Sequence, residues 1–208
     1  MNSNDVDRPK TLGDPDVLNQ RLQQIWLPHV APLTEFVLDL RKKIGNEAAI
    51  PYFDPLDAGI NAEVLFLLEA PGPKAVNSGF VSINNPDETA KNMFELTQEA
   101  GIPRDKSVLW NIVPWYIGSG NRIRPAKSGD IEKGTDPLIY LLKLLQKLRA
   151  IILAGKKAQT AERKIKNLKP SIPMFSCPHP SPLFVNRRPE NRRVILEKLM
   201  VVTEFLNN

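Results

Sequence analysis

Short apolar runs alternate with longer amphipathic stretches along most of the chain. The clearest run, at residues 64–68, contains no polar position, as in a strand that is buried on both faces of a sheet. We predict three more strands, at residues 108–113, 150–154 and 172–175. Because helical patterns separate these strands, the connections should be right-handed crossovers between parallel neighbours. The pattern predicts an α/β fold, a single three-layer α/β/α domain with a central, mainly parallel four-stranded sheet.

Apolar residues recur at helical spacing between the predicted strands. Residues 16–45 are predicted to form two helices that meet near Pro28 and Pro32 and pack on the core. Asn85-Pro86-Asp87-Glu88 has the composition of a helix start with Asn85 as the N-cap, and Gly101 should end that helix. Three further helices are predicted at residues 137–148, 156–168 and 189–206.

The length and composition fit one ordinary domain. With 208 residues, 42% of them hydrophobic, the chain can bury about 70% of the surface that it exposes when unfolded. We expect a flexible leader at residues 1–15 and one domain at residues 16–208. No apolar run reaches the length of a membrane span, and the first residues are polar and acidic, unlike a secretory signal. These features predict a cytoplasmic protein, nucleoid-associated if it is bacterial, with no membrane partner.

Charge is distributed unevenly along the chain. Residues 1–120 carry 10 Lys and Arg against 16 Asp and Glu, a net charge of −6, whereas residues 121–208 carry 18 against 7, a net charge of +11. A basic half of this kind favours a polyanionic partner such as a nucleic acid, although an ordinary solvated surface can have the same composition. One cysteine and two histidines are too few for a disulfide, a four-thiolate zinc site or an iron–sulfur cluster. We therefore expect no cofactor and no metal.

Three of the four predicted strands are followed by unusual sequences, at the sheet edge where α/β proteins bind ligands. Residues 68–73, Leu-Glu-Ala-Pro-Gly-Pro, form a rigid turn whose glycine permits close approach of a ligand. Asn111 places an amide near the second strand, and residues 179–183, His-Pro-Ser-Pro-Leu, form a stiff loop with an imidazole and an apolar tip. Each feature alone is also common in purely structural positions.

Two other patterns carry little weight. Gly155-Lys156-Lys157 lacks the spacing of a phosphate-binding loop, which excludes that site. Cys177 lies two residues before His179 in an extended loop, where the two side chains need not converge as a nucleophile and its base.

The order of these segments, with Ser78-Gly79-Phe80-Val81 between the first two, resembles the uracil-DNA glycosylase superfamily over roughly residues 63–200. Residues 179–187 resemble the second motif of that superfamily and the DNA-intercalation loop that follows it. Glu69-Ala70-Pro71-Gly72 is similar to the first motif of the branch with GEAPG, whose members carry an iron–sulfur cluster. With its single cysteine, this chain resembles a cluster-free relative of that branch.

The resemblance implies an enzyme that flips its target base out of the duplex, because a stacked base cannot be reached. Leu183 would fill the vacated space, with Phe184 beside it, and neighbouring residues would hold the DNA backbone. The implied DNA-binding set comprises Ser181, Pro182, Leu183, Arg187 and Arg188.

The resemblance also assigns roles to residues of the base-binding pocket. Phe80 would stack on the flipped base, and the Asn111 carboxamide would pair with uracil but be mismatched by cytosine. Pro71 and Gly72 complete the implied substrate-binding set. His179 would donate a hydrogen bond to the uracil anion that forms when the glycosidic bond breaks.

The position that activates the attacking water differs from other branches. The implied catalytic set is His179, Glu69 and Ala70, but other branches have Asp or Asn at the position of Ala70. The side chains left to orient water are Glu69, Asn77 and Asp87. Loss of the usual base would slow the reaction rather than abolish it.

We therefore predict a monofunctional DNA glycosylase of base-excision repair that hydrolyses the N-glycosidic bond of uracil or a related deaminated base. Its partner would be DNA containing that base, and we expect a monomer. Two alternatives remain open: a DNA-binding relative with weak or no catalysis, suggested by Ala70, and a glycosylase for another damaged base such as hypoxanthine. The candidate pocket walls that would set the choice of base are Trp110, Trp115 and Tyr116.

Overall fold

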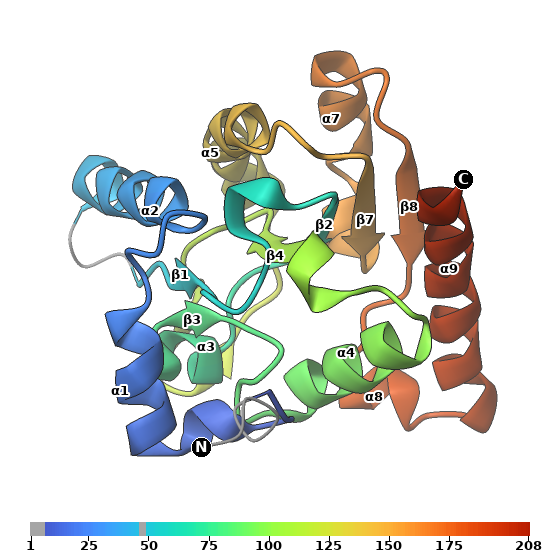
Figure 1. Cartoon of the computed structure of the whole chain (residues 1–208), viewed down its shortest axis with the longest axis horizontal. Coiled ribbons are helices and arrows are strands. Elements are labelled where there is room, and N and C mark those ends of the chain that lie inside the picture. The colour runs from blue at the N-terminus through green and yellow to red at the C-terminus, as the bar shows by residue number, and fades with distance from the viewer. Residues whose placement is uncertain (1–6, 46–48) are drawn as a thin grey trace.

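A four-stranded parallel sheet forms the centre of the protein (Figure 1). The computed structural model describes residues 7–45 and 49–208. Every neighbouring pair of strands in this sheet is parallel, and helices flank it. The predicted α/β fold with a central four-stranded parallel sheet is confirmed. The strands, in spatial order, are β4 (Ser107–Asn111), β2 (Val64–Leu68), β7 (Ala150–Ala154) and β8 (Met174–Cys177).

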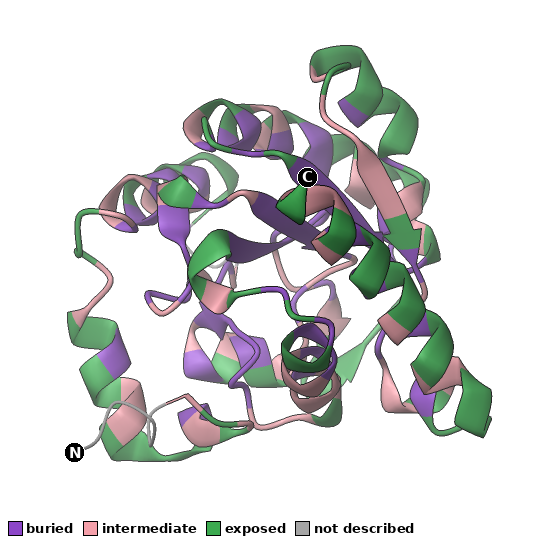
Figure 2. Ribbon diagram, turned by 45° about the vertical axis from the view of Figure 1, so that its right-hand side comes forward, coloured by how far each residue is buried: buried purple, intermediate pink, exposed green. Residues whose placement is uncertain are grey.

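Burial explains why the apolar runs become strands. Every residue of β2, β4 and β7 is buried, whereas β8 at the edge of the sheet has two half-buried residues, one exposed and one buried. Figure 2 shows this buried centre with the exposed residues on the outer sides of the helices. A continuous apolar run is therefore the pattern of an inner strand here, and the weaker pattern at β8 is why its predicted start is too early.

Helices connect and cover the strands. Among the described residues, no helix is long and apolar enough to cross a membrane. Helix α2 packs against α5, α9 runs beside β8, and α4 packs against α9 (Figure 1). The helices are α1 (Pro15–Gln23), α2 (Ala31–Ile44), α3 (Pro73–Ser78), α4 (Glu88–Glu99), α5 (Ser128–Leu144), α6 (Lys156–Gln159), α7 (Glu162–Leu168), α8 (Pro182–Val185) and α9 (Pro189–Asn207).

Two helix starts differ from the sequence prediction. The N-cap of α4 is Asp87, not Asn85, because the Asn85 amide is already used: it accepts from Ser78 Oγ at 2.6 Å and donates to the Phe80 carbonyl at 2.9 Å. Helix α5 begins at Ser128 and contains Pro137, which was predicted to start it. The Asp130 carboxylate accepts from the Lys127 amide at 2.8 Å and so supports the earlier start.

Four two-residue strands were not predicted, because so short a segment carries no periodic pattern. β1 (Tyr52–Phe53) pairs in parallel with β3 (Phe80–Val81). β5 (Gly118–Ser119) and β6 (Arg122–Ile123) form an antiparallel hairpin between β4 and α5.

The N-terminal segment contacts the core before α1 begins. Of the leader predicted at residues 1–15, residues 1–6 lie outside the described part of the chain. Within the rest, a 3-10 turn, η2 (Thr11–Gly13), lies against the loop before α4: the Leu12 amide donates to the Asn84 carbonyl at 3.0 Å, and Lys10 pairs with Glu88. Contacts of this kind were not anticipated from the sequence.

A buried network of charges joins the N-terminal region to the core. The Asp54 carboxylate is fully buried and pairs with Arg21 of α1 and, at 2.7 Å, with Arg104. It also accepts from Ser82 and from the Leu56 amide. Burial alone would raise the pKa of Asp54, but the charges of Arg104 and Arg21 outweigh it and lower that pKa. Asp54 is therefore a charged centre that holds three distant segments together.

Replacing Asp54 with Asn should lower the free energy of unfolding by about 3 to 5 kcal/mol, because two largely buried arginines lose a shared carboxylate. The matched control is Asp39→Asn, which breaks an exposed pair with Lys42 and should cost less than about 0.5 kcal/mol. Urea unfolding followed by circular dichroism measures both values. Equal stabilities of the two variants would contradict the central role of Asp54.

Candidate active site

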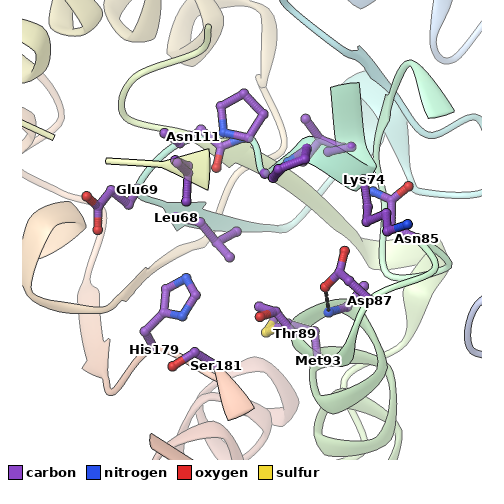
Figure 3. Close-up of a pocket in the computed structure, with 18 of the residues that line it drawn as sticks. Leu68, Glu69, Lys74, Asn85, Asp87, Thr89, Met93, Asn111, His179 and Ser181 are labelled. Atoms are coloured by element: carbon purple, nitrogen blue, oxygen red, sulfur yellow. Dashed lines mark hydrogen bonds between the residues drawn. The ribbon is translucent and has the colours of Figure 1, made fainter. Parts of the chain in front are cut away.

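A pocket of about 530 Å³ opens at the carboxyl ends of β2, β4 and β8 (Figure 3). Its volume is in the range of small-molecule sites, and its position is where α/β sheets bind ligands. The sequence segments after three strands, predicted to carry the chemistry, line it together with the start of α4 and the chain after β6. The lining residues are Leu68 to Ala75, Val81, Ser82, Asn85, Asp87, Thr89, Ala90, Met93, Leu109, Asn111, Ile123, Arg124, Pro125, His179, Ser181 and Leu183.

The turn after β2 continues the strand pairing and then opens the pocket. The Val113 amide donates to the Glu69 carbonyl at 3.0 Å, which extends the contact between β2 and β4. Pro71 and Gly72 lead into α3, and a Cβ added at Gly72 would meet no atom within 4 Å. Gly72 also lines the pocket, and open space lies where a side chain at this position would begin.

Glu69 lines the pocket but also has a structural partner. One of its carboxylate oxygens, Oε1, accepts a hydrogen bond from the Ala126 amide at 2.7 Å. This bond ties the turn after β2 to the chain that follows the β5–β6 hairpin. Glu69 thus holds two walls of the pocket together.

Asn111 is the last residue of β4 and lines the pocket at 4% exposure. Its carboxamide makes no hydrogen bond to any residue that the structure describes. Because the residue lines the pocket, its carboxamide donor and acceptor face the cavity instead of a protein partner. A side chain of this kind at a pocket wall is suited to recognise a ligand.

His179 enters the same pocket from the loop after β8 (Figure 3). Burial lowers the pKa of His179, and the charges of Glu69 and Asp87 oppose this shift. Since the ordinary pKa is 6.5, the imidazole is neutral at pH 7 and carries one N–H donor.

Gly155 makes room for His179. A Cβ added at Gly155 would lie 2.9 Å from His179 Cβ, closer than packed atoms allow, and 3.3 Å from Cδ2, which is a tight contact. Gly155 also has a φ of +93°, which side chains other than glycine rarely adopt. The residue directly after β7 is therefore part of the support of the imidazole.

Asp87 contributes a second carboxylate to the pocket wall. Its Oδ1 caps α4 by accepting from the Ala90 amide at 2.9 Å, and no described residue donates to Oδ2. Figure 3 draws Asp87, His179 and Asn111 around the same space. The capping bond fixes the orientation of the carboxylate.

Several residues predicted for the site lie outside the pocket. Phe80 is fully buried in β3, with its ring 6.4 Å from that of Tyr52, and its stacking on a base stays a prediction. Asn77 is exposed and does not line the pocket.

Trp110 is in the core, stacked on Phe53 at 4.3 Å. Trp115 and Tyr116 also do not line it. The single cysteine, Cys177, which was not assigned to the site, is buried, and burial raises its pKa to about 12.

The predicted DNA-binding loop lies at the mouth of the pocket. Leu183 is 87% exposed, an unusual position for a leucine that has a core nearby. The loop is held from behind, because Asn92 of α4 donates to the Pro180 carbonyl at 2.9 Å. Pro182 begins α8, and Arg187 and Arg188 are exposed in the turn before α9.

Sequence reasoning missed one wall of the pocket, formed by Ile123, Arg124 and Pro125. The signal that could have found it is Gly118-Ser119-Gly120-Asn121, a set of turn residues between apolar positions that is typical of a hairpin.

The sequence profile of the uracil DNA glycosylase superfamily matches residues 56–200. The chain belongs to the uracil DNA glycosylase superfamily. Members of this superfamily are typically DNA glycosylases, which makes DNA the expected class of ligand for the pocket. The resemblance proposed from the motifs is thus confirmed for the superfamily as a whole.

Other comparisons are more distant. No curated protein gives a significant match. A mutant of UNG from Nitratifractor salsuginis is similar in structure with a TM-score of 0.47 and 11% identity, over 89% of this chain and 98% of that one. A mutant of the mimivirus UNG in complex with UGI has a TM-score of 0.36 and 16% identity, over 90% of this chain and 75% of that one.

Replacing Gly155 with Ala should push the His179 ring from its position and expose it, so that its pKa rises toward 6.5. NMR titration of the imidazole signals measures this directly, with His29 as an internal reference in the same spectra. We also expect a loss of stability of about 1 to 3 kcal/mol from the strained backbone, since a φ of 93° with a ψ of 157° is a conformation for glycine.

The matched control is Gly129→Ala in α5, where an added Cβ meets nothing within 4 Å. It should leave the His179 titration unchanged. A Gly155→Ala protein with a wild-type His179 titration would contradict the packing role of Gly155.

Proposed function

We propose that this protein is a monofunctional DNA glycosylase that flips uracil or a related deaminated base out of DNA and hydrolyses its N-glycosidic bond. The observation that carries the proposal is the carboxamide of Asn111, which has no hydrogen-bond partner among the described residues and lines one pocket together with His179, an imidazole whose pKa burial lowers. We further propose that it is a cluster-free relative of the branch with GEAPG and HPS motifs, on the residues Glu69 to Gly72 and His179 to Ser181.

Asn111 would select the base. Its NH2 group can donate to O4 of uracil and its carbonyl can accept from N3–H, which satisfies both ends of the amide. Cytosine presents the opposite polarity at both positions, so that the buried amide would stay unpaired. The free energy lost in that mismatch is the source of discrimination.

His179 would act on the leaving group. When the glycosidic bond breaks, the sugar becomes an oxocarbenium ion and the base an anion with charge on O2. A neutral imidazole that already points into the pocket can donate its N–H to this oxygen without prior reorganisation. The bond strengthens as charge develops, so it stabilises the transition state more than the substrate.

Leu183 would stabilise the flipped state. Its side chain is exposed at the mouth of the pocket and can enter the space that the base leaves in the stack. Arg187 and Arg188, exposed a few residues further on, would hold phosphates of the same strand.

Asp87 and Glu69 are the two pocket carboxylates that can orient the attacking water, and of these we propose Asp87. Ala70 has no functional group, and Asn77 does not line the pocket. Each carboxylate has one oxygen bound by a backbone amide, that of Ala90 for Asp87 and that of Ala126 for Glu69, so variants of the two residues decide between them. Asp87 lines the pocket with one carboxylate oxygen that has no donor among the described residues, while its other oxygen is fixed by the helix cap. A carboxylate held in this way can accept a proton from water as the bond to the sugar forms.

The experiment that tests the function is single-turnover excision on oligonucleotides with uracil, hypoxanthine or xanthine, single-stranded and paired, with abasic sites revealed by alkali. We expect cleavage of the uracil strand. His179→Ala should slow it by about 10² to 10³-fold, and Asn111→Ala by about 10 to 100-fold.

The control is Asn77→Ala, an exposed asparagine outside the pocket, which should keep the wild-type rate. Full excision by His179→Ala or Asn111→Ala would contradict the site. Salt-sensitive binding of DNA without any cleavage would favour the alternative suggested by Ala70, a relative that binds DNA but has lost its chemistry.

Asp87→Asn should reduce the single-turnover rate by about 10²-fold without loss of folding, since Asn is as good an N-cap as Asp. Asp14→Asn is the matched control, because Asp14 caps α1 with its carboxylate at 2.8 Å from the Asp16 amide and does not line the pocket. An Asp87→Asn protein with the wild-type rate, beside a Glu69→Gln protein that has lost activity, would assign the water to Glu69 instead.

A further inference from the structure

Two exposed apolar side chains border the pocket, and the proposed function uses one of them. Among the described lining residues, Leu183 and Ile123 are large hydrophobic residues with exposed side chains, at 87% and 44%. They come from different elements, because Leu183 belongs to α8 and Ile123 to β6. Isolated exposed apolar residues are common on proteins, but one at the mouth of a ligand site is a candidate contact.

The hairpin that carries Ile123 is fixed in place. Its strands pair Gly118 with Ile123 and Ser119 with Arg122. The Tyr116 hydroxyl donates to the Gly120 carbonyl at 2.7 Å and so holds the turn. A contact surface that is already ordered loses little conformational entropy when it binds.

The chain that leaves the hairpin is also anchored on both sides. Arg124 forms two contacts with Asp130 at the start of α5, at 2.6 and 3.0 Å. The next bond, from the Ala126 amide to Glu69, joins this chain to the turn after β2. Ile123 therefore keeps its place relative to the pocket.

The charges beside Ile123 fit a nucleic acid. Arg122 is exposed and forms no ion pair with any residue that the structure describes. Lys127 is exposed at the other end of the segment. An apolar side chain next to an unpaired guanidinium matches a strand of DNA, which offers a base or sugar face beside a phosphate.

We propose that the β5–β6 hairpin is a second DNA-binding element, in which Ile123 packs on a nucleotide next to the flipped one and Arg122 contacts a phosphate. The inference rests on the proposed function, because the strand that delivers a base to the pocket must pass its mouth. Leu183 and Ile123 then contact the strand from two separate elements, and the nucleotide between them is the one that enters the pocket.

The test compares Ile123→Ala with Ile44→Ala, since Ile44 is 43% exposed at the end of α2 and does not line the pocket. Fluorescence anisotropy measures binding of a duplex with a tetrahydrofuran abasic analogue and of the same duplex intact. Ile123→Ala should weaken binding of the abasic duplex about 10-fold, as stacking contacts in nucleic-acid sites do, and Ile44→Ala should leave it unchanged.

Arg122→Gln supplies an independent readout. It should weaken binding of both duplexes and reduce the slope of log Kd against log salt by about one, the signature of one phosphate contact. Binding by Ile123→Ala and Arg122→Gln that equals that of Ile44→Ala would overturn the inference.

Wild-type excision separates the two proposals. If the wild type excises uracil while the hairpin variants bind as Ile44→Ala does, the hairpin inference fails and the proposed function stands. If the wild type neither excises a base nor prefers the abasic duplex, the proposed function fails and the hairpin inference falls with it.

Discussion

The parallel pairing of β2 with its neighbours is the constraint on which the site depends. Its register sets Leu68 opposite Asn111, and β7 and β8 end together at Ala154 and Cys177. Because parallel strands all end at the same edge, residues that are far apart in the sequence meet there without any direct bond between them. Glu69, Gly155 and His179 each lie within a few positions of a strand end, so their mutual placement is a property of the sheet.

Inner strands and strand ends could be predicted from the sequence because each leaves a local signal: an unbroken apolar run, then proline, glycine or a polar residue. Elements whose position depends on tertiary contacts could not. Asn85 resembles an N-cap, but Ser78 and Phe80 use its amide, so the cap moves to Asp87. The hairpin wall has strands of two residues, too short for a period. No local sequence signal marks the role of Gly155 either, because that role is to leave space for His179, which is distant in the sequence.

Some carboxylates of the acidic half, residues 1–120, are buried and do not contribute to the protein surface. Asp54 and Asp57 are buried, and with Asp7 they surround Arg104, while Arg21 shares Asp54. Burial raises the pKa of Asp57 to about 7, although Arg104 opposes this shift. These charges are used inside the fold. The same network takes Arg21 and Arg104 out of the first half, so it changes the balance of exposed charge by little. The net charge of +11 on residues 121–208 is what suits a polyanionic ligand.

Residues before the range matched by the superfamily help to hold the pocket in place. The matched residues begin at position 56, but the loop that carries Asp87 is held from outside that range, by Leu12 on Asn84 and Lys10 on Glu88. Arg21, also outside it, supplies part of the charge around Asp54. A fragment cut at the edge of the match would keep every motif of the family and lose the supports of one pocket wall. The range of sequence that identifies the superfamily is therefore shorter than the range that shapes the pocket.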